Sequence, residues 1–312
     1  MLKHMQIAVP PGIGDGVWAL MKVQSILNAE GYDVATVAVC TGGPQRSDEF
    51  LRRFSFVRDV WYCPFSCTEA EFWTEDGVYN YAPSQREWHN QFHWLLVPNQ
   101  HLEYGRRLDK WLPEYDTNWQ IAEEYEFTAE ETDYANRLRK RIGPFCVFYL
   151  GPENGNSEGS NAGHNRGALW TLSDWGQCYD WARSAGFEVV VVGADYDRLM
   201  WERVKPFMPD AHDAIGRWNI SKTFAVIKQA DFCLSYQSGI GIFATLMNVP
   251  TAIFWREHGN SIQSDRYVSF SEDMATAWVP PTHGPSDFAP LIYGRHHAEH
   301  AIESLSGFLG RS

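Results

Sequence analysis

The stretch ADFCLSYQSGIGIFATLMNVPTAIF, residues 230–254, decides the fold. An apolar run ends at Leu234, polar and small residues follow, and the apolar spacing of residues 240–247 is that of a helix. Pro250 then precedes a second apolar run, residues 251–254. Strand, turn, helix and strand in this order make up half of a doubly wound fold. The stretch therefore predicts an α/β protein with a parallel sheet.

The turn inside this stretch has the composition of an anion-binding site. Ser238 is placed to cap the helix, and Gly239 and Gly241 carry no side chain that would keep a ligand from the first helical N–H groups. Those N–H groups and the helix dipole attract phosphate. The same glycines also permit close packing of helix against strand, so both interpretations stand for this turn taken alone.

A second Gly-rich turn lies near the N-terminus. Residues 6–9 predict a short strand, PPGIGDG follows at 10–16, and a helical apolar spacing comes after it. The spacing of Gly12, Gly14 and Gly16 does not match the dinucleotide fingerprint, and no Gly-Lys-Ser/Thr follows to make a P-loop. A ligand other than a dinucleotide is therefore expected at this turn.

The length of 312 residues predicts two domains. We place the boundary at Gly143-Pro144, between a charged helix and a new apolar strand. The first domain, 1–143, contains an aromatic-rich insertion at about 63–119, which is either an acceptor-binding surface or a satellite hydrophobic cluster. The second domain is 144–312, and its last helix is expected to be able to pack back on the first domain.

Composition excludes several classes of protein. A net charge of −13 argues against broad attraction to nucleic acid. No apolar run approaches the roughly 20 residues that a membrane span needs, and no secretory signal is seen, so we expect a cytoplasmic protein without an integral membrane segment. The six scattered cysteines are interpreted as free thiols, and no metal site is expected. The oligomeric state is left open.

Several signposts together resemble the GT-B glycosyltransferases, in particular the heptosyltransferase-like branch that includes the ADP-heptose:lipopolysaccharide enzymes. They are Gly14-Asp15 in the first turn, a loop with a basic residue before Trp170, Leu172-Ser173-Asp174-Trp175, Ile215-Gly216, and Ala230-Asp231-Phe232 leading to Ser238-Gly239 and Pro250-Thr251. The resemblance covers residues 6–40 and 145–255. It implies two Rossmann-like domains facing a cleft.

The resemblance also implies a reaction and a set of site residues. The expected reaction is inverting, metal-independent transfer of a sugar from a nucleotide-diphosphate donor to an acceptor hydroxyl, with no cofactor besides this co-substrate. Asp15 matches the general base. The donor side is expected at Arg166, His164, Gly216, Gln237, Ser238, Gly239 and Gly241, and the acceptor side at Gly12, Gly14, Gly16, Trp88 and Trp94.

Two positions depart from the pattern of this family. The family commonly has Asp before the Ser-Gly pair and His three residues after it, whereas this chain has Gln237 and Ile242. These departures leave the identity of the donor sugar open.

The chemistry of sugar transfer by itself requires the residue types that the resemblance implies. The leaving nucleoside diphosphate gains charge, which a helix N-terminus and an arginine can stabilise without a metal. The acceptor hydroxyl needs a carboxylate within hydrogen-bond reach. Asp15 could instead serve as the cap of the helix that follows, but Gly12, Gly14 and Gly16 around it favour an open site.

Other functions remain open from the sequence. The acceptor is expected to be a saccharide or another hydroxyl compound, and a modified DNA base stays an alternative that the acidic charge disfavours. A nucleotide-sugar epimerase or hydrolase would fit the same fold. A non-catalytic module that binds sugar nucleotides is the alternative from outside catalysis.

Overall fold

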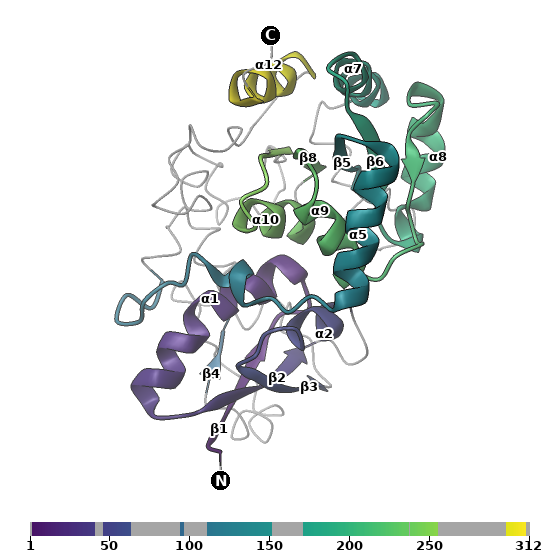
Figure 1. Ribbon diagram of the computed structural model, residues 1–312. Helices are drawn as coiled ribbons and strands as arrows, with labels where there is room; N and C mark the ends of the chain where they lie inside the picture. The colour runs from purple at the N-terminus through teal and green to yellow at the C-terminus, as the bar shows by residue number, and fades with distance from the viewer. Residues whose placement is uncertain are drawn as a thin grey trace, which may run out of the picture. The chain divides into compact units, whose positions relative to one another are not determined.

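The computed structural model describes residues 2–40, 46–63, 94–96, 111–151, 171–236, 238–254 and 298–309. They form two compact units, of which the first ends at Glu126 and the second begins at Phe127. Each unit contains one parallel sheet with helices packed against it (Figure 1). The predicted α/β class with two Rossmann-like halves is confirmed.

The first unit contains a sheet in the order β3-β2-β1-β4, in which every described pairing is parallel. Its elements are β1 (His4–Val9), α1 (Ile13–Glu30), β2 (Val34–Cys40), α2 (Arg46–Leu51), β3 (Val57–Cys63), β4 (Trp94–Leu95) and the 3-10 helix η4 (Ile121–Glu124). The apolar side chains from Met5 to Val9 in β1 and from Ala35 to Val39 in β2 are fully buried, as expected of parallel strands covered on both faces.

Helix α1 is covered by protein on more than one face, which explains why so many of its residues are apolar. Gly31 ends the helix in the left-handed conformation, with φ 70°. Lys22 is 1% exposed, and its Nζ donates to the carbonyl oxygens of Tyr115 at 2.6 Å and Leu112 at 3.3 Å. The N–H of Asn118 donates to the carbonyl of Met21. The segment from residue 111 onward thus covers the helix face that the sheet does not.

The second unit contains a parallel sheet in the order β7-β6-β5-β8-β9. Its elements are α5 (Ala129–Ile142), β5 (Phe145–Tyr149), α7 (Leu172–Ser184), β6 (Glu188–Val192), η5 (Asp195–Asp197), α8 (Arg198–Val204), η6 (Lys205–Phe207), β7 (His212–Asp213), α9 (Ile220–Lys228), β8 (Phe232–Tyr236), α10 (Gly239–Leu246), β9 (Thr251–Phe254) and α12 (Ala298–Leu309).

The boundary between the units differs from the one expected at Gly143-Pro144. Helix α5 begins with a capping box between Thr128 and Glu131, and it packs against α9 of the second unit. The Arg139 guanidinium also donates to both carboxylate oxygens of Asp231, at 2.9 and 3.0 Å. Gly143-Pro144 is therefore a tight connection inside the second unit, and the first unit ends before α5.

The last helix, α12, contacts α7 and β9 of its own unit. The buried Asp174 carboxylate accepts from the N–H of Ala298 at 3.0 Å and from the N–H of Thr171 at 2.6 Å. One carboxylate therefore caps the starts of both helices. The contacts of the described residues place α12 on α7 and β9 of the second unit, and its packing on the first domain stays a prediction.

Strand β8 continues beyond the predicted end at Leu234. Ser235 pairs with Tyr149 of β5 and Ile253 of β9, and it is fully buried although polar. Its hydroxyl donates to the carbonyl of Tyr236 at 2.7 Å. Pairing on both edges extends the strand to Tyr236, because the sheet ladder bonds the backbone whatever the side chain is.

Candidate functional site

Both sheets have a topological switch point, where ligands of open α/β sheets bind. In the first unit the chain goes from β1 to β2 and β3 on one side, and β4 pairs on the other side of β1. In the second unit it goes from β5 to β6 and β7, and then β8 pairs on the other side of β5. The predicted Gly-rich turns directly follow β1 and β8. Each turn therefore lies beside the switch point of its own sheet.

Asp15 occupies the third position of α1, and the cap of this helix is Gly12. The Gly12 backbone is extended, with φ −70° and ψ 140°, and no side chain caps it. A Cβ built on Gly12 would lie 3.3 Å from Cγ of Asp15 and closer still to Oδ2. The half-buried Asp15 carboxylate therefore lies over Gly12. An acidic side chain at the third helical position commonly reaches back to the start of its helix in this way.

The structure gives different surroundings to Gly12, Gly14 and Gly16, which were all predicted to lie on the acceptor side. Gly12 makes room for the Asp15 carboxylate. Gly14 and Gly16 are buried, and a Cβ on Gly16 would meet Cδ2 of Leu51 at 3.4 Å, an ordinary packing distance. Asp15 is not the N-cap that the alternative interpretation assumed, although the N3 position also suits a carboxylate.

Trp94 lies on β4, where it pairs with Ile7 of β1. Its ring is half-buried and packs edge-to-face against Tyr115, with centroids 5.7 Å apart at 89°. This contact gives the indole a packing role in the first unit. A role of Trp94 toward an acceptor stays a prediction.

The turn between β8 and α10 has the predicted helix cap. Ser238 Oγ accepts from the N–H of Gly241 at 3.4 Å, and Ser235 Oγ lies 3.2 Å from Ser238 Oγ. The N–H groups of Gly239 and Ile240 have no acceptor within the helix, as is general for a first turn. These two groups are the ones that a phosphate oxygen at this helix start would approach.

Gly241 fits the packing interpretation that the sequence left open. A Cβ at this position would lie 2.8 Å from Ser235 Oγ and 3.1 Å from Cγ1 of Ile253. Its N–H is bonded to Ser238. The missing side chain therefore lets α10 approach β8 and β9, and a role of Gly241 toward the donor stays a prediction.

A close approach at the switch point of the second sheet was not predicted. Gly151 follows β5 with φ 78°, and a Cβ there would lie 3.0 Å from the ring of Tyr236 at the end of β8. The side chain of Tyr236 thus rests on the backbone that leaves β5. The signal was present in the sequence, since a glycine directly after a buried strand often marks such an approach.

The turns after β6 and β7 are joined at Gly216. Its N–H donates to the carbonyl of Gly193 at 2.9 Å, and its φ is 70°. The exposed Asp195 carboxylate lies directly over the Gly216 backbone, so a Cβ there would collide with Oδ1. Asp195 had no predicted role. The structure brings it to the predicted donor-side residue Gly216 at the carboxyl ends of these strands.

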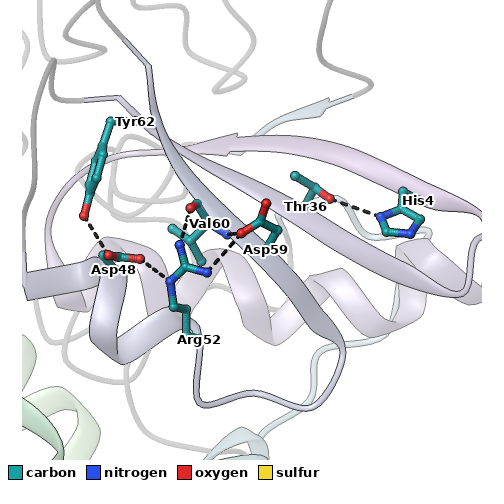
Figure 2. Close-up of polar contacts among 7 residues, drawn as sticks. All are labelled: His4, Thr36, Asp48, Arg52, Asp59, Val60 and Tyr62. Atoms are coloured by element: carbon teal, nitrogen blue, oxygen red, sulfur yellow. Dashed lines mark hydrogen bonds and ion pairs between the residues drawn. The ribbon is translucent and has the colours of Figure 1, made fainter.

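The polar side chains between α2 and β3 form hydrogen bonds and ion pairs with one another. Figure 2 shows Arg52 between Asp48, at 2.7 Å, and Asp59, at 3.0 Å, with the Tyr62 hydroxyl donating to the other oxygen of Asp48. Arg52 also donates to the carbonyl of Val60. Its hydrogen bond lowers the pKa of Asp59. We interpret these bonds as contacts that hold α2 against the edge strand β3.

Four predicted site residues lie outside the described residues: His164, Arg166, Gln237 and Trp88. The same holds for most of the aromatic-rich insertion. Their expected roles stay predictions.

Neither a metal cluster nor a membrane span is present in the part of the chain that the structure describes. Its His, Cys, Asp and Glu side chains form no group of three or more that could hold a metal ion. None of its helices has both the length and the apolar character to cross a bilayer.

Comparison with solved structures identifies the architecture. The chain is similar to the ADP-heptose LPS heptosyltransferase II of E. coli, with TM-score 0.57, 13% identity and coverage of 99% of this chain and 98% of the other. A family 9 glycosyl transferase from Veillonella parvula has TM-score 0.61, 10% identity and coverage of 99% and 98%. The iron-containing dodecameric glycosyltransferase TibC of enterotoxigenic E. coli has TM-score 0.50, 11% identity and coverage of 99% and 75%.

Sequence comparison adds no assignment. No model of a known family matches the chain, and no curated protein matches it significantly. At identities of 10–13% the structural likeness establishes the fold, that of GT-B glycosyltransferases, over nearly the whole chain. Substrate and mechanism do not follow from it.

Proposed function

We propose that this protein is a glycosyltransferase that moves a sugar from a nucleotide-diphosphate donor to an acceptor hydroxyl. The observation that carries the proposal is the position of the two turns. A carboxylate-bearing turn and a capped helix start each lie beside the switch point of a sheet, in a fold shared with glycosyltransferases. One structural neighbour is an ADP-heptose LPS heptosyltransferase, and this likeness supports a nucleotide sugar as the donor here.

In the proposed reaction Asp15 is the general base. Its carboxylate takes the proton of the acceptor hydroxyl, whose oxygen attacks the anomeric carbon as the bond to the diphosphate breaks. Attack on the face opposite the leaving group inverts the configuration. The half-buried position of Asp15 beside Gly12 leaves the carboxylate close to small groups that do not obstruct an acceptor.

The leaving diphosphate is proposed to bind at the start of α10. The N–H groups of Gly239 and Ile240 and the helix dipole favour negative charge there, and Ser238 holds the turn through its bond to Gly241. From the family resemblance, Arg166 would neutralise further charge, with His164 two residues before it in the sequence. This arrangement would need no metal, and we propose a metal-independent reaction.

The donor is tested by thermal unfolding of the full chain with UDP-, ADP-, GDP- and TDP-sugars. A ligand of the folded state at about 100 times its Kd stabilises by about 2.7 kcal/mol, which raises the Tm measurably. Absence of any shift with the whole panel would contradict the proposal. Conversion of a sugar nucleotide without acceptor would instead indicate an epimerase or a hydrolase. Transfer that persists in excess EDTA is expected.

The base is tested by Asp15→Asn, which keeps the shape of the side chain and removes its basicity. We expect kcat to fall by about 100-fold or more while donor binding is retained. The matched control is Asp33→Asn, because Asp33 precedes β2 at the opposite end of the same sheet. Full activity of the Asp15 variant would exclude its role as base, and ligand binding without turnover in the unaltered protein would indicate a binding module.

A further inference from the structure

Ser235 is a buried polar residue in an apolar strand. Strand β8 reads FCLSY, and Ser235 has no exposed surface, because β5 and β9 flank it on both sides. A buried hydroxyl lowers stability unless its hydrogen bonds are satisfied within the protein. The partners of the Ser235 hydroxyl therefore indicate what it contributes to the turn that follows.

A directed chain of hydrogen bonds runs through this hydroxyl. Ser235 Oγ donates to the carbonyl of Tyr236 at 2.7 Å and lies 3.2 Å from Ser238 Oγ. A hydroxyl has one proton, and a carbonyl oxygen can only accept. Because Ser235 uses its proton for Tyr236, Ser238 is the donor between the two serines. Ser238 Oγ in turn accepts from the N–H of Gly241 at 3.4 Å.

The direction of this chain decides which groups at the start of α10 can bind an anion. The Ser238 proton is directed to the buried Ser235 and away from a ligand. The Tyr236 carbonyl, whose negative end would repel a phosphate, is bonded to the Ser235 hydroxyl. The N–H groups of Gly239 and Ile240 are left as donors, and neither has an acceptor in the described part of the chain.

We infer that Ser235 is a positioning residue for the diphosphate of the sugar donor. It is buried and does not touch the sugar donor itself. It acts through Ser238, whose oxygen it holds in place to cap α10, and through the Tyr236 carbonyl, which it directs away from the phosphates. This role rests on the proposed function, because it requires the diphosphate to bind at α10.

The packing beneath α10 fixes the position of this hydroxyl. A Cβ on Gly241 would lie 2.8 Å from Ser235 Oγ and 2.9 Å from Ser235 Cβ, so the serine side chain fills the space under the first turn of the helix. A buried polar network with all its bonds satisfied favours a single conformation. Loss of the hydroxyl would therefore loosen the turn that presents the N–H groups of Gly239 and Ile240, without removing any group that contacts the diphosphate.

The first test is Ser235→Ala, which removes the hydroxyl and introduces no larger group. Calorimetric titration of the full chain with UDP, ADP, GDP and TDP identifies the nucleoside diphosphate that the unaltered protein binds. Its affinity is expected to fall by about 3- to 10-fold in Ser235→Ala, the effect of one or two weakened hydrogen bonds. In steady-state transfer the KM of the sugar donor should rise, while the KM of the acceptor stays unchanged.

The matched control is Thr251→Val, on the neighbouring strand β9. Thr251 is 1% exposed, and its hydroxyl donates to the carbonyl of Val249 at 2.7 Å, a bond of the same kind and length as that of Ser235. Thermal unfolding should show a lower Tm for both variants, because each loses a buried hydrogen bond. Only Ser235→Ala should weaken diphosphate binding. Equal affinity in Ser235→Ala and the unaltered protein, or an equal loss in the two variants, would overturn the inference.

A second test asks whether Ser235 acts through Ser238. Ser238→Ala breaks the chain one step closer to the diphosphate, so the loss of affinity in the double variant should be clearly smaller than the product of the two separate losses. Losses that multiply would contradict the hydrogen-bonded chain. An unaltered protein that binds none of these diphosphates would contradict the proposed function, whereas affinity retained in Ser235→Ala contradicts only the positioning role.

Discussion

Replacement of Gly12 by alanine would test the Asp15 carboxylate without altering it. The extended backbone of Gly12, φ −70° and ψ 140°, is open to any residue, so alanine meets no conformational penalty there. The new Cβ would, however, fall 3.3 Å from Cγ of Asp15 and inside the closest approach to Oδ2. Relief to the ordinary separation of 3.4 Å requires the carboxylate to move by about 1 Å.

The two consequences of this movement differ in size. A carboxylate is the mobile end of its side chain, so the free energy of unfolding should fall by no more than about 1 kcal/mol. Misplacement of a reacting group by about 1 Å costs about 100-fold in rate. Gly12→Ala is therefore expected to lower kcat of sugar transfer by about 10- to 100-fold while Tm and donor-induced stabilisation stay close to those of the unaltered protein.

The assay is steady-state transfer with the donor found by thermal shift, together with thermal unfolding of each variant. Gly16→Ala is the matched control, because its Cβ meets only Leu51 at the ordinary distance of 3.4 Å. Gly12→Ala in the Asp15→Asn background should add little further loss, since the group it displaces is already inactive. Full kcat in Gly12→Ala, with the protein folded, would refute the argument that the position of this carboxylate matters.

Three further predictions concern the second unit. Gly216→Ala should lower the free energy of unfolding by about 1–3 kcal/mol, measured by urea titration, because φ is 70° and the new Cβ meets the Asp195 carboxylate. Asp231→Asn should lower it by about 1–3 kcal/mol, seen as a lower Tm, because both bonds from Arg139 lose their charged acceptor. Burial raises the pKa of the Cys233 thiol to about 12, so iodoacetamide at about pH 9 should label this residue only after unfolding, as read by mass spectrometry.

Each of these predictions has a contrasting case or an outcome that contradicts it. Gly31→Ala shares φ 70° with open space around its Cβ, so it should cost less than Gly216→Ala. An Asp231→Asn protein as stable as the unaltered one would mean that α5 is held by apolar packing alone. Labelling of native Cys233 as fast as in urea would contradict its burial.

Local features of the fold were predictable from the sequence. The strands and helices follow from apolar periodicity, and the caps Thr128, Thr171 and Ser238 follow from residue types whose side chains bond to the first helical turn. These signals are local, because a helix start or a strand is decided by neighbours within a few residues. The placement of both Gly-rich turns after parallel strands was predictable for the same reason.

What required the tertiary structure involves residues far apart in the chain. The first unit ends before α5 because Arg139 meets Asp231, and α12 is held on α7 because Asp174 reaches Ala298. Likewise, the packing role of Gly241 follows from Ser235 and Ile253, which lie beside the position of its missing side chain.

Residues 230–254 show most clearly which features the sequence determines and which the tertiary structure determines. Their sequence by itself determined a strand, a capped helix start and a second strand, since hydrogen bonding and periodicity act over short distances. Only the tertiary structure decided that β8 lies between β5 and β9 at a switch point. It also showed that the missing side chain of Gly241 allows α10 to pack on the sheet. Strand order depends on which distant segments bury one another, and no local pattern encodes that choice.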